Sequence, residues 1–170
     1  MISESPMRRG EQWLKTLLQL TAINTEVRGD IESRVIGYSD SPEGEAYWLK
    51  VDESNLTPEQ IRTLIGPNGS VLDAIQYLAN SILNLNQIEE QQASYTVELN
   101  GYRIRRQAEI REIAESAASQ VRSTGREVEI MSLSSAERRQ VHRFLKDFTD
   151  LETFSRGKEP HRHLVVRPAY

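Results

Sequence analysis

Residues Leu56–Leu85 read LTPEQIRTLIGPNGSVLDAIQYLANSILNL, and two helical patterns meet there with almost no connecting loop. Thr57 at the cap, Pro58 at the first helical position and Gln60 three residues after the cap predict the start of the first helix. The second helix is predicted from apolar residues that recur at helical spacing, namely Val71, Ile75, Leu78 and Ile82.

The corner between these helices is Gly66-Pro67-Asn68-Gly69, with two glycines three residues apart. Such a corner exposes unpaired backbone N–H groups at the start of the second helix, where the helix dipole carries partial positive charge. These groups suit a phosphate, and glycine allows a sugar-phosphate backbone to approach closely. The alternative interpretation is a tight helix corner that binds no ligand.

The elements around this corner predict a compact α+β layer in the first half of the chain. Before the corner we expect a helix over 10–20 and strands over 33–38 (SRVIGY) and 45–52 (EAYWLKVD), joined through a turn at 39–44. After it, residues 93–100 (ASYTVELN) alternate apolar and polar side chains like a strand. The predicted order is helix, strand, strand, helix, helix, strand.

The second half of the chain begins with a charged bridge at Gly101 and a long helix over about 102–123. Gly125 is a natural residue to follow the end of that helix. Ser134 and Glu137 form a capping box that opens another helix, whose Val141, Phe144, Leu145 and Phe148 face inward. Strands are expected at 126–131, 151–155 and 163–168. The domain boundary is predicted near Asn100.

Composition and charge narrow the classes of function. The chain has 170 residues, of which 38% are hydrophobic and 27% charged, as in a globular protein. It has no cysteine, which excludes disulfides and thiol-ligated metal, and no apolar run long enough to span a bilayer. Residues 1–100 hold 7 Lys+Arg against 15 Asp+Glu, whereas residues 101–170 hold 14 against 10. This asymmetry indicates a polyanion-binding segment on an acidic body, or else an ordinary arginine-rich helix surface.

The basic half contains Arg138 and His142, four residues apart and therefore on one side of their helix. A guanidinium offers a planar fork of donors to phosphate oxygens, and a ring nitrogen of histidine can donate as well. Arg139 points further outward, and Lys158 and Arg162 add charge at the polar turn after residue 155. The alternative is a solvated helix edge. The remaining candidates are Phe154 and Tyr170 for base stacking and, less favoured, His161 and His163 for metal.

The corner and its surroundings resemble the K-homology domain in its bacterial (type II) topology, whose GxxG loop clamps single-stranded nucleotides. Gly66 and Gly69 take the two glycine positions of that family. The family commonly has Lys or Arg between the glycines, but here Pro67, which lacks an N–H, and Asn68 occupy those positions. We therefore expect this loop to bind phosphate weakly or to contact protein.

SSAERRQVHRFLKDF and ETFSRGKEPHRHLVVRP resemble the helix and the closing segment of the Arg-xxx-His domain, a single-stranded nucleic-acid-binding fold. By this resemblance the motif positions are Arg138, His142, Ser155, Gly157 and Arg162. The proposed nucleic-acid-binding residues are these five together with Arg139, Lys158, Gly66, Asn68 and Gly69.

The order of the two domains resembles the bacterial Jag family, also called KhpB or SpoIIIJ-associated proteins, without the N-terminal Jag domain. The resemblance implies a tail (1–8), a K-homology domain (9–100) and an Arg-xxx-His domain (101–170). It further implies a cytoplasmic, non-enzymatic protein that binds single-stranded RNA, or single-stranded DNA, as a post-transcriptional regulator or RNA chaperone. No cofactor, metal, catalytic residue or direct membrane insertion is expected. A second small K-homology protein or a second copy is an expected partner. The alternative is a protein-interaction scaffold whose K-homology half has a degenerate RNA site.

Overall fold

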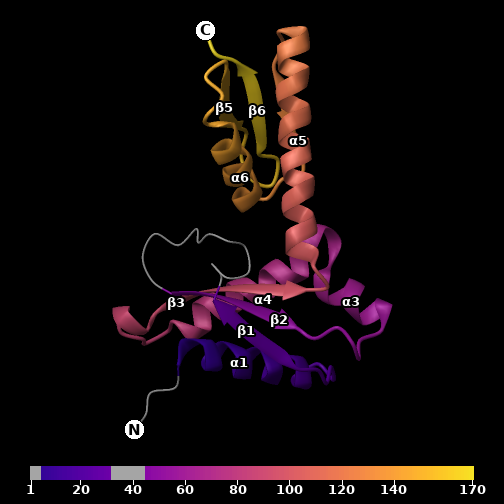
Figure 1. Cartoon of the computed structure of the whole chain (residues 1–170), viewed down its shortest axis with the longest axis vertical. Coiled ribbons are helices and arrows are strands. Elements are labelled where there is room, and N and C mark those ends of the chain that lie inside the picture. Colours follow the sequence, from indigo (N-terminus) through magenta and orange to yellow (C-terminus); the bar gives the residue numbers. More distant parts are fainter. Residues whose placement is uncertain (1–4, 32–44) are drawn as a thin grey trace. The chain divides into compact units, whose positions relative to one another are not determined.

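A computed structural model describes residues 5–31 and 45–170. The chain divides into two compact units, Met1–Arg103 and Ile104–Tyr170 (Figure 1). Each unit contains helices packed on a three-stranded sheet, which confirms the predicted α+β class. The predicted strand over 33–38 and the turn over 39–44 lie outside the described residues.

The first unit has the described element order helix, strand, strand, helix, helix, strand. Its main elements are α1 (Pro6–Leu20), β1 (Val27–Ile31), β2 (Glu45–Val51), α3 (Pro58–Ile65), α4 (Ser70–Leu83) and β3 (Ala93–Leu99), with short 3-10 turns η1 (Pro67–Gly69) and η2 (Glu89–Gln91). β2 lies in the middle of the sheet, antiparallel to β1 and parallel to β3. The capping box predicted at Thr57 and Gln60 is present at the start of α3.

One face of this sheet carries the core. Alternate residues of β2 and β3, such as Leu49 and Val97, point to the same side, where they meet Leu14 of α1 and Leu72 of α4. All four side chains are at most 1% exposed. The prediction of helix α4 is confirmed, but its buried face is offset from the predicted stripe and comprises Leu72, Ala79 and Leu83, with Ile75 partly buried.

Strand β1 is absent from the sequence-based prediction because its residues have little strand character. Only Val27 of this strand is buried, and Gly29 lies at its centre. The Gly29 N–H donates to Glu11 Oε1 at 2.6 Å, so α1 helps to hold the strand. A β-carbon on Gly29 would lie 2.6 Å from Met7 Cγ, which explains the glycine.

The outer edge of β3 is covered by a row of amide side chains from α4. Asn80 donates to the Tyr95 carbonyl at 2.7 Å and accepts from the Tyr95 N–H at 2.9 Å. Asn84 makes the same pair of bonds to Ala93, both at 2.8 Å. Four residues on a helix span about the same length as two on a strand, so these amides match the spacing of the edge groups. Backbone groups that would otherwise be unpaired are thereby satisfied.

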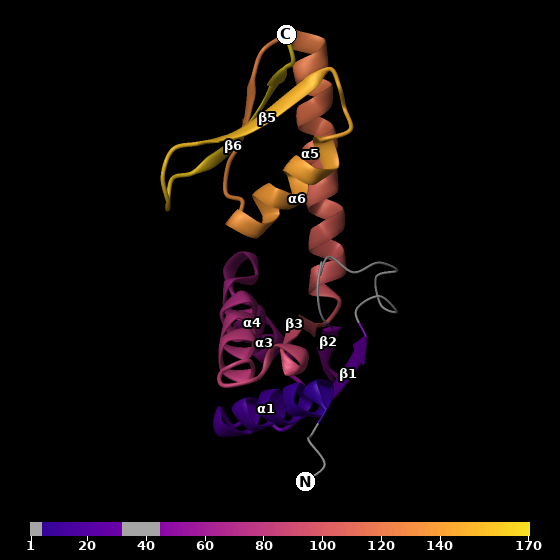
Figure 2. The ribbon, with the colours of Figure 1, turned by 90° about the vertical axis from the view of Figure 1, so that its left-hand side faces the viewer.

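The second unit contains the rest of α5 (Tyr102–Thr124), whose first two residues belong to the first unit. Its other elements are β4 (Val128–Ile130), α6 (Ser135–Leu145), β5 (Leu151–Arg156) and β6 (His163–Pro168), with the sheet ordered β4-β6-β5. Helices α5 and α6 pack on the same face of this sheet (Figure 2). The core includes the predicted α5 stripe, represented by Ala114 and Val121, together with Val141 of α6 and Val166 of β6.

Candidate nucleic-acid interface

A polar pocket forms in the second unit where the core-facing side of β5 changes from apolar to polar. Leu151, Thr153 and Ser155 share this side by alternation, but only Leu151 is buried. Beside the two hydroxyl-bearing residues lies α6, which brings its basic face to the same place. The pocket is lined by Ser135, Arg138, Arg139, His142, Thr153, Phe154, Ser155, Arg162 and Leu164.

Half of the residues predicted from the sequence meet in this pocket: Arg138, Arg139, His142, Ser155 and Arg162. Gly157 and Lys158 lie in the adjoining turn between β5 and β6 and do not line the pocket. The φ of Gly157 is +88°, and a β-carbon there would lie 2.6 Å from the His161 carbonyl oxygen. Gly157 therefore shapes the turn.

Helix α6 is fixed at its start by hydrogen bonds within the capping box. Ser134 Oγ accepts from the Glu137 N–H at 3.2 Å, and Glu137 Oε2 accepts from the Ser134 N–H at 2.8 Å. Glu137 also pairs with Arg106 of α5, at 2.7 Å between Oε1 and Nε. Val141 and Leu145 anchor the buried side of α6. These contacts fix the direction in which Arg138, Arg139 and His142 leave the helix.

Arg138 is only 5% exposed, so the prediction that it borders the apolar stripe at a solvated edge is wrong. Its Nη1 donates to the Leu133 carbonyl at 2.8 Å and to the Arg162 carbonyl at 3.3 Å. Its Nη2 pairs with the Glu159 carboxylate. A buried guanidinium needs such acceptors, and these acceptors come from three separate segments of the chain. Its role as a phosphate ligand stays a prediction.

His142 is exposed, and its Nδ1 contacts the Thr153 hydroxyl. A hydroxyl can donate or accept, so it pairs with either tautomer of the ring. In both tautomers the contact fixes the ring plane. No described residue pairs with Nε2, which leaves that atom for a ligand.

The free positive charge of the pocket resides on Arg139 and Arg162. Both are exposed, and neither forms an ion pair within residues 5–31 and 45–170. Other arginines of the unit are neutralised: Arg122 pairs with Asp150 at 2.6 Å, and Arg156 with Glu129 at 2.6 Å. These partners hold the pKa of Asp150 below its ordinary value and that of Arg156 above it, through side-chain hydrogen bonds first and charge second.

The aromatic candidates differ in their surroundings. Phe154 lies between two guanidiniums, with Arg156 at 5.4 Å and Arg167 at 4.9 Å from the ring centre, and Tyr170 is fully exposed. Phe144 and Phe148 pack against the core at their inner sides and against each other edge to face, at 5.9 Å between ring centres. The expectation that these two face inward is met in part, because both keep some exposed surface.

The Gly66–Gly69 corner has a structural requirement for both glycines. Their φ values are +71° and +78°, and a β-carbon on Gly69 would lie 2.5 Å from the Tyr102 ring. The backbone N–H groups of Gly66, Gly69 and Ser70 donate to carbonyls of the corner and of α3. Pro67 has no N–H, so few donors of the corner remain for a phosphate. Binding by Gly66, Asn68 and Gly69 stays a prediction.

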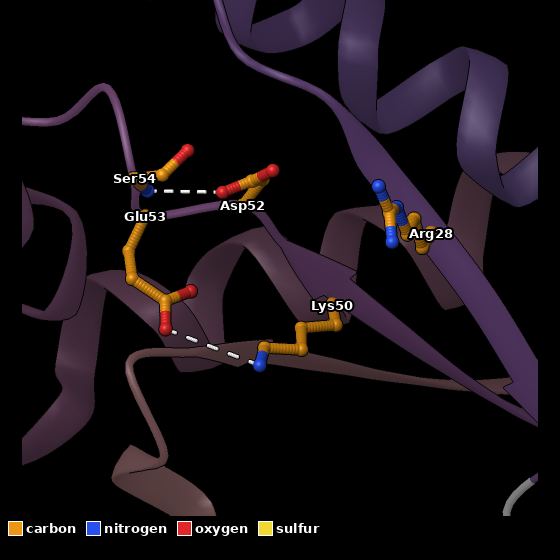
Figure 3. A pocket seen from close by; sticks show the side chains of 5 residues that line it. All are labelled: Arg28, Lys50, Asp52, Glu53 and Ser54. Carbon is orange, nitrogen blue, oxygen red and sulfur yellow. Dashed lines mark hydrogen bonds and ion pairs between the residues drawn. The ribbon is translucent and has the colours of Figure 1, made fainter.

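A second hollow, in the first unit, has mixed charge (Figure 3). Arg28 and Lys50 lie directly opposite each other on β1 and β2, and the hollow also holds Asp52, Glu53 and Ser54. Hydrogen bonds from Ser54, and secondarily the two cations, hold the pKa of Asp52 below its ordinary value. The two carboxylates offset the cations, so this hollow suits a phosphate less well than the pocket of the second unit.

Sequence reasoning missed two pocket residues that a local signal indicates. Thr153 is two residues before Ser155 on the same strand, so period-two alternation brings it to the same side. Ser135 is three residues before Arg138, one helical turn away. Among the described residues no group of three or more His, Cys, Asp or Glu side chains could hold a metal ion. No helix in the described ranges is long and apolar enough to cross a membrane.

Comparisons with known proteins bear on the same region. Residues 108–168 match the family model of the Arg-xxx-His domain. Three curated relatives carry the name "RNA-binding protein KhpB". The protein of Lactiplantibacillus plantarum is 35% identical over 103 residues, which is 61% of this chain and 31% of the relative. That of Bacillus subtilis is 25% identical over 95% of this chain and 70% of the relative. That of Clostridium symbiosum is 31% identical over 66% of this chain and 50% of the relative.

The matches therefore span between 31% and 70% of the length of these relatives. The relatives agree with one another in name, and their matches accompany the domain match that contains the pocket. The chain belongs to the KhpB (Jag) family, with an Arg-xxx-His domain at residues 108–168.

Proposed function

We propose that this protein binds single-stranded RNA through the pocket of its second unit. The observation that carries the proposal is the meeting of Arg139, Arg162 and His142 beside two hydroxyl-bearing residues of β5. Neither arginine forms an ion pair with any residue that the structure describes. Guanidiniums suit phosphate oxygens, and contacts of this kind give affinity without reading sequence. The hydroxyls of Thr153 and Ser155 and the His142 Nε2 are suitable partners for a ribose 2′-OH.

The broader role that we propose is post-transcriptional regulation or RNA chaperoning in the cytoplasm, by binding and without catalysis. The names of the curated relatives support an RNA ligand, and those names belong to proteins that this chain matches only in part. We propose in addition that the first unit is a K-homology domain. Its described element order and its GxxG corner support this assignment. The satisfied N–H groups of the corner support a weak contribution from that unit.

The test is a binding measurement on the full chain with a short fluorescein-labelled oligouridylate. We expect unlabelled single-stranded RNA to compete and an RNA duplex to compete poorly. His142→Ala should weaken binding, because it removes the ring beside Thr153. His161→Ala is the matched control, since His161 is also exposed and does not line the pocket. Equal loss in both variants, or equal competition by the duplex, would contradict the proposal.

A second candidate function is favoured by an exposed apolar surface on α4. This α4 patch consists of Val71, Tyr77, Leu78 and Ile82, which are 37%, 72%, 43% and 49% exposed. Asp73 is the single charged residue of the helix. Exposed apolar surface of this kind marks contact sites, and a nearly uncharged helix can approach a copy of itself without repulsion. We propose that the patch pairs with a second copy or with a small K-homology protein.

Sedimentation velocity of the full chain over a range of concentrations tests this second function. The α4 patch predicts association that Ile82→Glu abolishes. Ser81→Glu places the same charge on an exposed neighbour outside the patch and should have a smaller effect. A protein that remains monomeric at all concentrations, and does not associate with a small K-homology protein either, would refute this candidate.

A further inference from the structure

We infer that Glu159 is an internal competitor of the ligand phosphate: its carboxylate occupies Arg138 in the free protein and must be exchanged for RNA. The inference rests on the proposed RNA-binding function and concerns the regulation of the same site. Glu159 lies in the turn between β5 and β6, close in sequence to Lys158 and Arg162, and is the acidic residue of that turn.

The two partners of this ion pair differ sharply in exposure. The Arg138 side chain is 6% exposed, and that of Glu159 is 60% exposed. The carboxylate therefore reaches a buried cation from the solvent side. Removing Glu159 from its partner returns a mostly hydrated group to water, which costs little. Leaving Arg138 without an anion costs much more, because a buried guanidinium is then uncompensated.

The guanidinium stays in place without Glu159. Nη1 of Arg138 is held by the carbonyls of Leu133 and Arg162, at 2.8 and 3.3 Å, and Glu159 contacts Nη2 alone. Carboxylate and phosphate oxygens bind the same donors of a guanidinium with similar geometry. A phosphate entering the pocket, which Arg138 also lines, can therefore take over Nη2 without moving the arginine. The exchange keeps the buried charge compensated throughout.

The formal charge around the pocket supports this competition. Three arginines line it, and the Glu159 carboxylate neutralises one of them in the free protein. A phosphate that meets an undisplaced Glu159 is repelled by a like charge a few ångströms away. Over about 4 Å this repulsion is worth about fivefold in affinity even with the screening of bulk water.

The decisive experiment compares RNA binding by Glu159→Gln and Glu152→Gln in the full chain, with the labelled oligouridylate as the probe. Both variants remove one negative charge from an exposed, ion-paired side chain of the same unit, 60% and 52% exposed respectively. Glu152 pairs with Arg167 and does not line the pocket. We expect Glu159→Gln to bind about fivefold more tightly than the parent, and Glu152→Gln to differ by less than about twofold.

A double-mutant cycle with Arg138→Lys separates competition at Arg138 from a general charge effect. A lysine keeps the charge but not the fork that Glu159 and phosphate share. The gain from Glu159→Gln should shrink in the Arg138→Lys background, and an undiminished gain would overturn the inference. If Arg138→Lys does not fold, the comparison of the two single variants decides alone.

The other outcomes are equally informative. If Glu159 only braces the fold, Glu159→Gln lowers the midpoint of urea unfolding and leaves RNA affinity equal to that of Glu152→Gln, which overturns the inference. If the parent binds RNA through the pocket and Glu159→Gln binds no better, the competition fails while the proposed function stands. If neither parent nor variants bind the probe, the proposed function fails and the inference falls with it.

Discussion

Replacing Arg139 and Arg162 together by alanine should lower the salt dependence of RNA binding by a calculable amount. The two guanidiniums line the pocket, and no ion pair within the described ranges neutralises either of them. Each single-strand phosphate that a cation neutralises adds about 0.7 to the slope of log K against log salt, so the double variant should lose about 1.4. Arg138 adds little to this difference, because Glu159 already neutralises it in the free protein.

The assay is fluorescence anisotropy of the labelled oligouridylate over a series of salt concentrations, with the parent and variants in parallel. Arg126→Ala with Lys146→Ala is the matched control. Both residues are exposed cations of the second unit, and neither lines the pocket. The control should leave the slope close to that of the parent. An equal loss of slope in the two double variants would refute a localised site and indicate diffuse attraction over the basic half of the chain.

Three further predictions concern the framework of the first unit. Burial raises the pKa of Glu98, which is 2% exposed and accepts from the Arg103 N–H at 3.0 Å. A raised folded-state pKa favours folding below the unfolded value of about 4.3 and loses that contribution as pH rises through the folded value. The free energy of unfolding of the parent minus that of Glu98→Gln should therefore fall between acidic and neutral pH in urea titrations; a flat or rising difference contradicts the burial argument. Asn80→Ala should cost about 2–4 kcal/mol, because it unpairs both backbone groups of Tyr95, a residue that is 1% exposed. The exposed Asn55→Ala is its control, and equal midpoints of urea unfolding for these two variants would show that the amide row does not protect the edge. Gly69→Ala should destabilise the first unit by about 1–3 kcal/mol, because its new methyl would meet the Tyr102 ring at φ +78°. A thermal midpoint equal to that of Ser70→Ala would contradict this requirement for glycine.

Elements encoded by neighbouring residues could be predicted from the sequence. The capping boxes at Thr57 and Ser134 each need only residues three positions apart, and both are present. The strands that end the chain also follow from local alternation, and the match to β5 and β6 differs by one residue at most. Local chemistry therefore sufficed for the caps and for the closing hairpin.

Features that depend on distant partners could not be predicted in this way. Strand β1 contains a glycine and two charged residues, and its place depends on contacts to α1. Helix α4 has two apolar sides, and the sequence does not say that Leu72 rather than Val71 faces the sheet. The burial of Arg138 follows from two carbonyls and Glu159, the farthest of them 24 residues away in sequence. The pattern identified the chemistry of the candidate site, but which arginines remain free depends on the tertiary structure.

The most direct measurement of the central claim is a titration of the ¹⁵N-labelled full chain with unlabelled oligouridylate, followed by backbone amide shifts. The account predicts that the largest changes cluster at the pocket, at Ser135, Arg139, His142, Thr153, Ser155 and Arg162, with small changes at the Gly66–Gly69 corner. Changes centred on that corner, with the pocket amides unmoved, would contradict it.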